Sequence, residues 1–572
     1  MPHAAENIEL LAELCRRAEL TVDDALSLAE YRGEITLYAS RLSPAVAKIL
    51  ARRPAGICFQ SLCDISVETA ESLAFHRACL IFAAFPTLSD DLAKVLSGAT
   101  CGLVFPRVRA LSPQAATCLA SHEGRLCFEN IQSLCLEAAD ALSGHAGLLE
   151  IGPLTDIGDD VASLLSRHSG VLRLDIVHLS DSVAAAIAQA KGKALVLRRV
   201  QALTRSAAIA LSEHASQLSV LRSTLWSLAA VEALARHKGP LELAYEVMMC
   251  AGDADALADR DGELLLFNPR HLSESDARQL AKHRGPLTLQ GLESLSPRVA
   301  ATLAAHEGRL DIVDTPLTVE AIDALSSHLH PLGIDLPTIT EEMAVALALH
   351  SGTALLIGEA KTLSATVATK LAVYQGNLSL ASLTAVDRDA ASALSEHSGG
   401  LHLPAVKRLD DDVIEILVQH RGGVWLDGLE LVTDAGLEVL RANEQFHLPE
   451  DIQSIEQRDR DCKKRIADLV QHARSLASEK KLAEALPYYE NAVLLAEHSL
   501  GTDDPVVLMI YYDIGACNYS LDRLSEAEHA FRAGIAIAKR CRGKPDLPPL
   551  MEPVSINRVS LPMDRPCPLA EA

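Results

Sequence analysis

A hydrophobic pattern with a period of 23 residues runs along the chain from about residue 10 to residue 448. Each unit has apolar residues at a spacing of three and four over about ten residues, followed by an alternating segment such as Leu287–Leu289. The first spacing predicts an amphipathic helix, and the alternation predicts a short strand. The pattern therefore predicts nineteen units of one helix and one strand each.

Local signals support the boundaries of these predicted helices. Serine followed by proline opens several units, as at Ser43, Ser112 and Ser296, which is typical of a helix N-cap and its first turn. Glycine follows the helix end in most units, where we expect a left-handed C-cap. Two residues before that glycine, one marker position holds histidine in twelve units: His76, His122, His145, His168, His214, His237, His283, His306, His328, His350, His397 and His420.

The marker histidines suggest a structural role. The carboxyl end of a helix has unpaired carbonyl groups and a negative dipole end, so a donor or a cation is favoured there. Lys191, Arg260 and Arg53 replace histidine in other units and fit the same role. Stacked helices lie about 8–10 Å apart, whereas zinc ligands lie about 2 Å from one ion. We therefore expect caps and no metal site, with pH sensing as the open alternative.

One helix and one strand cannot bury their own apolar face, so the units must stack into a parallel sheet with helices on one side. The motif "LxL" with "xxLxxL" over residues 287–295 resembles the leucine-rich repeat family, in a helix-bearing form that occurs in some bacterial proteins. The resemblance implies an α/β solenoid over residues 10–448. Where the usual repeat has Asn or Cys, this chain has Leu292, Ile131 or Leu383, so we expect apolar packing to hold that turn.

The pattern changes after residue 448. Residues 449–462 are charged and are expected to form a linker. The segments "KLAEALPYYENAVLLAEHSL" and "RLSEAEHAFRAGIAIAKRC" then align at an offset of 42, which places Tyr489 with Phe531. This resembles the tetratricopeptide repeat, in the long form found in kinesin light chains, and implies an all-α domain over residues 463–542. Two units leave an exposed face, which the helix near Arg465–Glu479, the solenoid end or a second chain would cover.

Composition restricts the partners and the compartment. The net charge is −24 and the pI is about 5.3, which argues against general binding to nucleic acid or anionic lipid. The thirteen cysteines form no Cys-x-x-Cys pair, and the first twenty residues have no apolar leader segment. We expect reduced thiols and a cytoplasmic protein without a membrane span. Residues 543–572 contain seven prolines and no period, so they are expected to be disordered.

Motifs of catalysis are missing from the sequence. It contains no Gly-x-x-x-x-Gly-Lys-Ser/Thr loop, no Gly-x-Ser-x-Gly elbow and no His-Glu-x-x-His helix. We therefore expect no enzyme and no cofactor. The repeats favour a scaffold or adaptor that binds protein partners, with a regulatory or targeting subunit of a separate catalytic protein as the alternative.

Partner-binding candidates come from the middle position of each predicted strand, which should face the open side of the sheet. An apolar strip is formed by Ile81, Val104 and Cys127, unless the register is shifted by one residue. Cys58 occupies the same strand position, and the exposure expected for Cys58 and Cys127 leaves a redox role open for either thiol.

Two further candidates lie on the same face. A basic cluster, unusual in so acidic a chain, comprises Arg173, Arg198, Arg199 and Arg222, which would receive an acidic segment or remain solvated. Trp425, one of two tryptophans, is a candidate anchor for a partner.

Overall fold

The structure is a computed structural model that describes residues 12–541 except 30, 156, 224–226, 246–251, 451 and 502–503. The side chains of residues 222–223, 458–459, 498–499 and 539–541 also lie outside the described part, as does the predicted tail over residues 543–572. The chain forms two compact units. The first unit consists of the chain up to Pro404 together with the short segment His420–Trp425. The second unit consists of Ala405–Gln419 and the chain from Leu426 onward.

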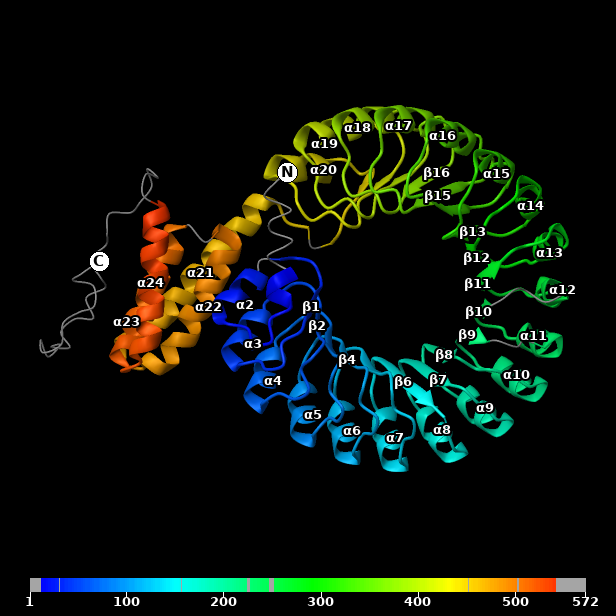
Figure 1. The fold of residues 1–572 in the computed structure, drawn as a ribbon. Coiled ribbons are helices and arrows are strands. Elements are labelled where there is room, and N and C mark those ends of the chain that lie inside the picture. Colours follow the sequence, from blue (N-terminus) through cyan, green and yellow to red (C-terminus); the bar gives the residue numbers. More distant parts are fainter. Residues whose placement is uncertain are drawn as a thin grey trace, which may run out of the picture. The chain divides into compact units, whose positions relative to one another are not determined.

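A sheet of nineteen strands confirms the predicted α/β solenoid and its number of units. Consecutive strands pair in parallel, as β11 and β12 do through Leu264↔Leu287 and Leu266↔Leu289. In the first compact unit the strands line the inner side of an arc and the helices its outer side (Figure 1). The strands are β1 (Ile35–Leu37), β2 (Ile57–Phe59), β3 (Leu80–Phe82), β4 (Leu103–Phe105), β5 (Leu126–Phe128), β6 (Leu148–Leu154), β7 (Val171–Ile176), β8 (Ala194–Arg198), β9 (Gln217–Ser223), β10 (Leu241–Tyr245), β11 (Leu264–Arg270), β12 (Leu287–Leu292), β13 (Leu310–Val313), β14 (Leu332–Asp335), β15 (Ala354–Gly358), β16 (Asn377–Leu380), β17 (Leu401–His402), β18 (Val424–Trp425) and β19 (Phe446–His447).

The helices of the repeats are six to nine residues long, too short to be stable alone, so their stability comes from packing against neighbours. The predicted N-caps are present: the Ser112 side chain accepts a 2.9 Å hydrogen bond from the Ala115 amide. These helices are α2 (Val22–Ala29), α3 (Pro44–Leu50), α4 (Val67–Leu73), α5 (Asp90–Leu96), α6 (Pro113–Leu119), α7 (Leu136–Ser143), α8 (Asp159–Leu165), α9 (Asp181–Ala188), α10 (Arg205–Ser212), α11 (Leu228–Leu234), α12 (Asp253–Ala258), α13 (Glu274–Leu280), α14 (Pro297–Leu303), α15 (Val319–Leu325), α16 (Glu341–Ala348), α17 (Ala365–Leu371), α18 (Arg388–Ser395), α19 (Asp411–Leu417) and α20 (Asp434–Ala442).

The core between sheet and helices is a set of ladders in which equivalent side chains of successive units stack. The N-terminal units carry phenylalanine at one inward strand position, and Phe59, Phe82, Phe105 and Phe128 stack with ring centroids 5.5–5.6 Å apart. The turn after the strand is apolar as expected, because Ile131, Leu292 and Leu383 are all buried.

The marker histidines form a second ladder, and seven of the twelve form a hydrogen bond with a carbonyl oxygen of the unit before their own. Nδ1 of His76 lies 3.2 Å from the carbonyl oxygen of Ala51, the C-cap of α3, and Nε2 of His306 lies 3.0 Å from that of Gly285. Tyr374 occupies the same position and donates its hydroxyl to Gly352. These seven histidines and Tyr374 therefore cap carbonyl groups of the preceding unit rather than of their own helix.

Two expectations about this ladder are wrong. Neighbouring rings are 5.8–6.4 Å apart, closer than the expected 8–10 Å, because the column lies near the sheet, where units are spaced by the strands. The helix end was also expected to favour the charged form of histidine. Burial instead lowers the pKa of all twelve, that of His306 to about 4.

The glycine after the marker histidine was also interpreted wrongly. The described glycines with positive φ are Gly252, Gly291 and Gly501, so the glycines that follow the marker are not left-handed caps. Space is the reason for glycine here. A Cβ on Gly170 would lie 2.0 Å from the carbonyl oxygen of Gly147 in the preceding unit, which allows no side chain.

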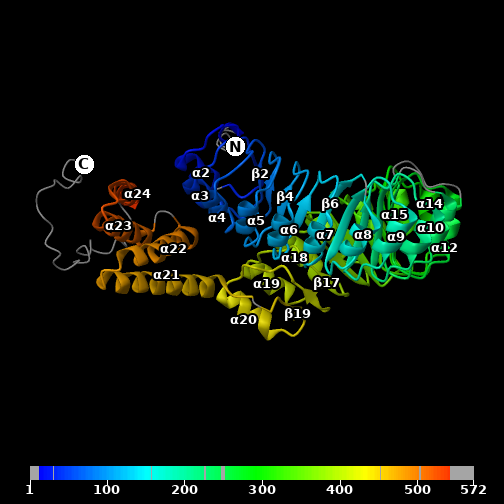
Figure 2. The ribbon, with the colours of Figure 1, turned by 90° about the horizontal axis from the view of Figure 1, so that it is seen from below.

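The C-terminal helices pair as two antiparallel hairpins, α21 (Ile455–Ser478) with α22 (Leu482–Leu500) and α23 (Pro505–Ser520) with α24 (Leu524–Cys541) (Figure 2). The helix near Arg465–Glu479 belongs to this domain, because Ile466 and Ala473 of α21 lie in the same hydrophobic core as Ala485 and Tyr489. Gly515 of α23 leaves space for the Phe531 ring of α24. The exact domain boundaries remain a prediction.

Candidate functional site

The middle residues of the strands form one continuous row across the open face of the sheet. The parallel register pairs Cys58 with Ile81, Val104 with Cys127 and Arg173 with Val196, and it continues in the same way to the pair of His402 and Trp425. The flanking strand residues point to the core: Leu287 and Leu289 are buried on either side of the partly exposed Thr288. The register assumed from the sequence is therefore the one that the strands adopt.

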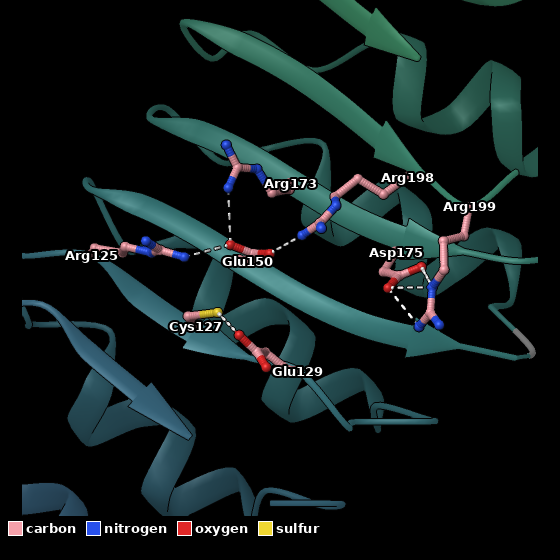
Figure 3. Close-up of polar contacts among 8 residues, drawn as sticks. All are labelled: Arg125, Cys127, Glu129, Glu150, Arg173, Asp175, Arg198 and Arg199. Carbon is pink, nitrogen blue, oxygen red and sulfur yellow. Dashed lines mark hydrogen bonds and ion pairs between the residues drawn. The ribbon is translucent and has the colours of Figure 1, made fainter. Parts of the chain in front are cut away.

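The predicted apolar strip is only partly open. Ile81 is partly exposed, whereas Val104 is 5 % exposed and Cys127 is fully buried. Polar side chains surround the Cys127 thiol: its Sγ lies 3.9 Å from the Glu129 carboxylate, and Arg125 and Glu150 interact with it (Figure 3). An apolar contact with a partner is thus available at Ile81 but closed at Cys127.

Chemical labelling tests this placement of Cys127. Burial, with the neighbouring Glu150 charge, raises the pKa of Cys127 to about 12, so its thiol is protonated and shielded. In the native protein we expect a bulky maleimide to label the exposed Cys63 and Cys135 and to leave Cys127 unmodified until denaturant is added. Peptide mass spectrometry measures the labelling of each cysteine in the native and in the denatured protein. Rapid native labelling of Cys127 would show that it is accessible and would restore the redox hypothesis.

The basic cluster is organised around one carboxylate that the sequence did not single out. Glu150 on β6 is 5 % exposed and pairs with Arg125 at 3.0 Å, Arg173 at 3.1 Å and Arg198 at 2.5 Å (Figure 3). Burial alone would raise the pKa of Glu150, but the three guanidinium charges outweigh it and lower the pKa below its ordinary value. Three arginines around one glutamate leave an excess of two positive charges in this cluster of four side chains.

The other predicted basic residues lie apart from this carboxylate. Arg199 forms a two-point ion pair with Asp175 at 2.7–2.8 Å (Figure 3). The side chain of Arg222 lies outside the described residues. The structure thus brings together Arg173 and Arg198, adds Arg125, and places Arg199 in a balanced pair.

A pocket opens between these two groups of ion pairs. Its lining includes Glu129, Glu150, Asp175, Arg198 and Arg199. Its floor is Gly152, where a Cβ would lie 2.2 Å from the Cβ of Asp175. The pocket therefore offers both carboxylate and guanidinium groups to a partner's side chain.

Trp425 lies at the far end of the row and stacks on His402. The ring centroids are 4.1 Å apart and the rings are parallel within 2°. A Cβ on Gly400 or Gly423 would lie within 3 Å of the indole, so the two glycines leave space for the ring to lie there. Both rings are partly exposed, and they present an aromatic surface on the open face.

Metal binding and membrane spanning find no support in the described part of the chain. Those residues contain no group of three or more His, Cys, Asp or Glu side chains arranged to hold an ion. Among them no helix is both long and apolar enough to cross a bilayer.

Comparisons with known proteins found one family model and several solved structures that are similar to parts of the chain. The tetratricopeptide repeat family matches residues 466–540. One similar solved structure is an internalin from Listeria monocytogenes, with 13 % sequence identity, coverage of 56 % of this chain and 92 % of that chain, and a TM-score of 0.31. Another is the Toll–Spatzle complex from Drosophila, with 14 % identity, coverage of 74 % of this chain and 63 % of that chain, and a TM-score of 0.30. A third is a leucine-rich-repeat protein from Leptospira interrogans, with 16 % identity, coverage of 76 % of this chain and 99 % of that chain, and a TM-score of 0.22. No curated protein matches the chain.

The chain is thus a leucine-rich-repeat-like solenoid followed by a tetratricopeptide domain. The first assignment rests on the strand and helix of each unit and on their parallel register, since the TM-scores are low. Repeat proteins of both kinds generally bind other proteins on their extended surfaces.

Proposed function

We propose that this protein is a non-enzymatic scaffold or adaptor that works in the cytoplasm and binds protein partners on the open sheet face and on the tetratricopeptide domain. The free cysteines described in the structure support a reducing compartment. The predicted residues on the open face, from Ile81 through the arginines to Trp425, are the proposed contacts.

One observation carries this proposal. Flanking strand positions repeat with little change because the core fixes them, as at Leu264, Leu287 and Leu310, which pair in one ladder. The middle position between them changes from unit to unit, as at Leu265, Thr288 and Asp311. Packing therefore does not determine this row, and a varied row on a rigid sheet suits the recognition of one particular partner.

Affinity purification of the full chain with mass spectrometry tests the proposal. We expect Thr288→Arg with Ser379→Arg, two partly exposed positions of the row, to lose at least one partner that the unchanged chain retains. The matched control is Ser275→Arg with Thr369→Arg, which makes the same exchanges at exposed positions of α13 and α17. Loss from both variants alike, or from neither, would contradict binding on the open face.

The same experiment addresses the alternative of a regulatory or targeting subunit. A scaffold is expected to retain different partners through its two repeat domains. A subunit is expected to retain one enzyme in a constant ratio to the chain. Quantitative mass spectrometry of the retained proteins separates the two outcomes.

A further inference from the structure

The open face of the sheet is divided into a basic and an acidic part. The basic part spans β5 to β8 and contains Arg125, Arg173 and Arg198, whose positive charge exceeds that of their shared Glu150. Arg107, exposed in the loop after β4, extends it. All of these arginines are at least partly exposed, so they remain accessible to a partner.

The acidic part spans β13 and β14. Asp311 and Asp335 lie on these strands, and Asp314 follows β13 directly. Arg309 pairs with Asp311 at 2.8 Å, and neutral Gln290 donates to Asp314 at 3.3 Å. Burial, together with the charges of Asp314 and Asp311, raises the pKa of Asp335. Carboxylates that destabilise one another in this way would be stabilised by an incoming cation.

The carboxylates of Asp311 and Asp335 are partly exposed on the open face. The Asp311 carboxylate lies where a side chain of Gly333 would otherwise be, since a Cβ there would be 2.0 Å from Oδ1. Asp335 lies over Gly358 in the same way. The two glycines therefore leave the space in which the Asp311 and Asp335 carboxylates lie.

The distance between the basic and the acidic part determines how long a segment must be to contact both. Six strand spacings separate β7 from β13, which at about 4.8 Å each is roughly 29 Å. An extended chain covers that distance in about nine residues at ~3.3 Å per residue. The row between them holds the uncharged Val196, Ser219, Leu265 and Thr288, together with Glu242.

We propose that the open face binds one extended protein segment whose acidic residues lie over Arg125, Arg173 and Arg198 and whose basic residues, about nine positions away, lie over Asp311, Asp314 and Asp335. The segment crosses the strands and contacts the intervening row. This inference rests on the proposed function and specifies the chemistry of the partner at that surface. Charge complementarity at both ends would fix the direction of the segment as well as its position.

Fluorescence anisotropy with two labelled peptides tests the inference on the full chain. One peptide has four glutamates, a five-residue Gly/Ser spacer and four lysines, and the other has the same composition with alternating charges. We expect the first to bind at least tenfold more tightly at low salt and to lose most of this advantage at high salt. Equal affinities of the two peptides would overturn the proposal.

Charge exchange provides the internal control. Arg173→Glu with Arg198→Glu, or Asp314→Lys with Asp335→Lys, should each abolish the tenfold preference. Both pairs of exchanges together should restore it, because the segment can then bind in the opposite direction. Arg205→Glu with Arg298→Glu, at exposed helix positions, should change nothing. Failure of the combined variant to restore binding, or an equal loss in the helix control, would contradict the proposal.

Folding of the variants is checked by circular dichroism. If the charge reversals do not fold, Arg173→Gln with Arg198→Gln and Asp314→Asn with Asp335→Asn replace them, and each should reduce the preference at least threefold. Unchanged preference in both would count against the proposal. If the peptides show no preference while Thr288→Arg with Ser379→Arg still loses partners, the charge-segregated ligand is wrong and the scaffold function stands.

Discussion

Acidification from pH 7 to pH 4.5 is expected to unfold the solenoid in a steep transition. Twelve marker histidines are buried and have lowered pKa values, so the folded state holds them neutral. An unfolded chain protonates them near pH 6.5. Their contribution to stability is therefore complete above pH 6.5 and is lost as the pH falls toward the folded pKa, which for His306 is about 4. Each histidine contributes up to about 1.4 kcal/mol per pH unit, so a few suffice to exceed the 5–15 kcal/mol of a typical domain.

Circular dichroism against pH measures this transition, and the slope of unfolding free energy with pH gives the protons taken up. Between pH 6.5 and pH 5 the measured proton uptake comes mainly from histidine, because carboxylates ordinarily titrate near pH 4. His306→Tyr adopts the residue that the chain uses at Tyr374, and it should reduce proton uptake by about one and lower the acid midpoint. His271→Tyr, at an exposed histidine, should leave both unchanged. A fold that is stable and takes up no protons down to pH 4.5 would contradict the neutral ladder.

Phe105→Ala is expected to produce the largest loss of stability from a single substitution in the N-terminal units. Its ring is fully buried and stacks at 5.5 Å on both Phe82 and Phe128. Removing a buried phenylalanine costs about 3–5 kcal/mol, and each lost aromatic pair adds about 0.5–1.5 kcal/mol. Because contacts in a repeat array are between neighbours, the effect should concentrate in β3 to β5.

Urea unfolding gives the change in free energy, and hydrogen exchange locates it. Phe75→Ala is the matched control, since the Phe75 side chain is 80 % exposed, and it should change stability by less than about 0.5 kcal/mol. Loss of protection is expected in β3 to β5 before the later strands. A change below about 1 kcal/mol for Phe105→Ala would show that the aromatic ladder does not stabilise these units.

Sequence periodicity was sufficient to predict the solenoid because each unit repeats the same physical constraints. Leu287 and Leu289 alternate around Thr288, and this alternation specifies both the strand and the side that faces outward. Ser112 and Pro113 begin a helix for reasons that are entirely local. Tyr489 and Phe531, 42 residues apart, likewise indicated the tetratricopeptide domain, to which the family match gives residues 466–540.

Features set by contacts between units could not be predicted in detail. The histidine ladder was interpreted as a set of caps, and seven of its twelve side chains bind carbonyl groups, but only the stacked structure shows that His76 binds Ala51 of the previous unit. Gly170 was expected to supply a left-handed turn. It is required instead because the carbonyl oxygen of Gly147 lies in the space of its missing side chain.

The open face shows the same limit. Arg173 and Arg198 were recognised from their strand positions, whereas Arg125 was missed because it lies two residues before the middle of its strand. Glu150 was not recognised as the shared partner, since only the parallel pairing across β5 to β8 brings these side chains together. Burial of Cys127 depends on these same neighbours.

Site-specific photo-cross-linking tests most directly whether the open face is the binding surface. A photoreactive amino acid replaces Thr288 on the open face, and in a matched chain it replaces Ser275 on α13. Both full-length chains are irradiated in the presence of the partners that affinity purification retains. The proposed scaffold function predicts cross-links from position 288 and none from position 275. Cross-links from position 275 alone would contradict it.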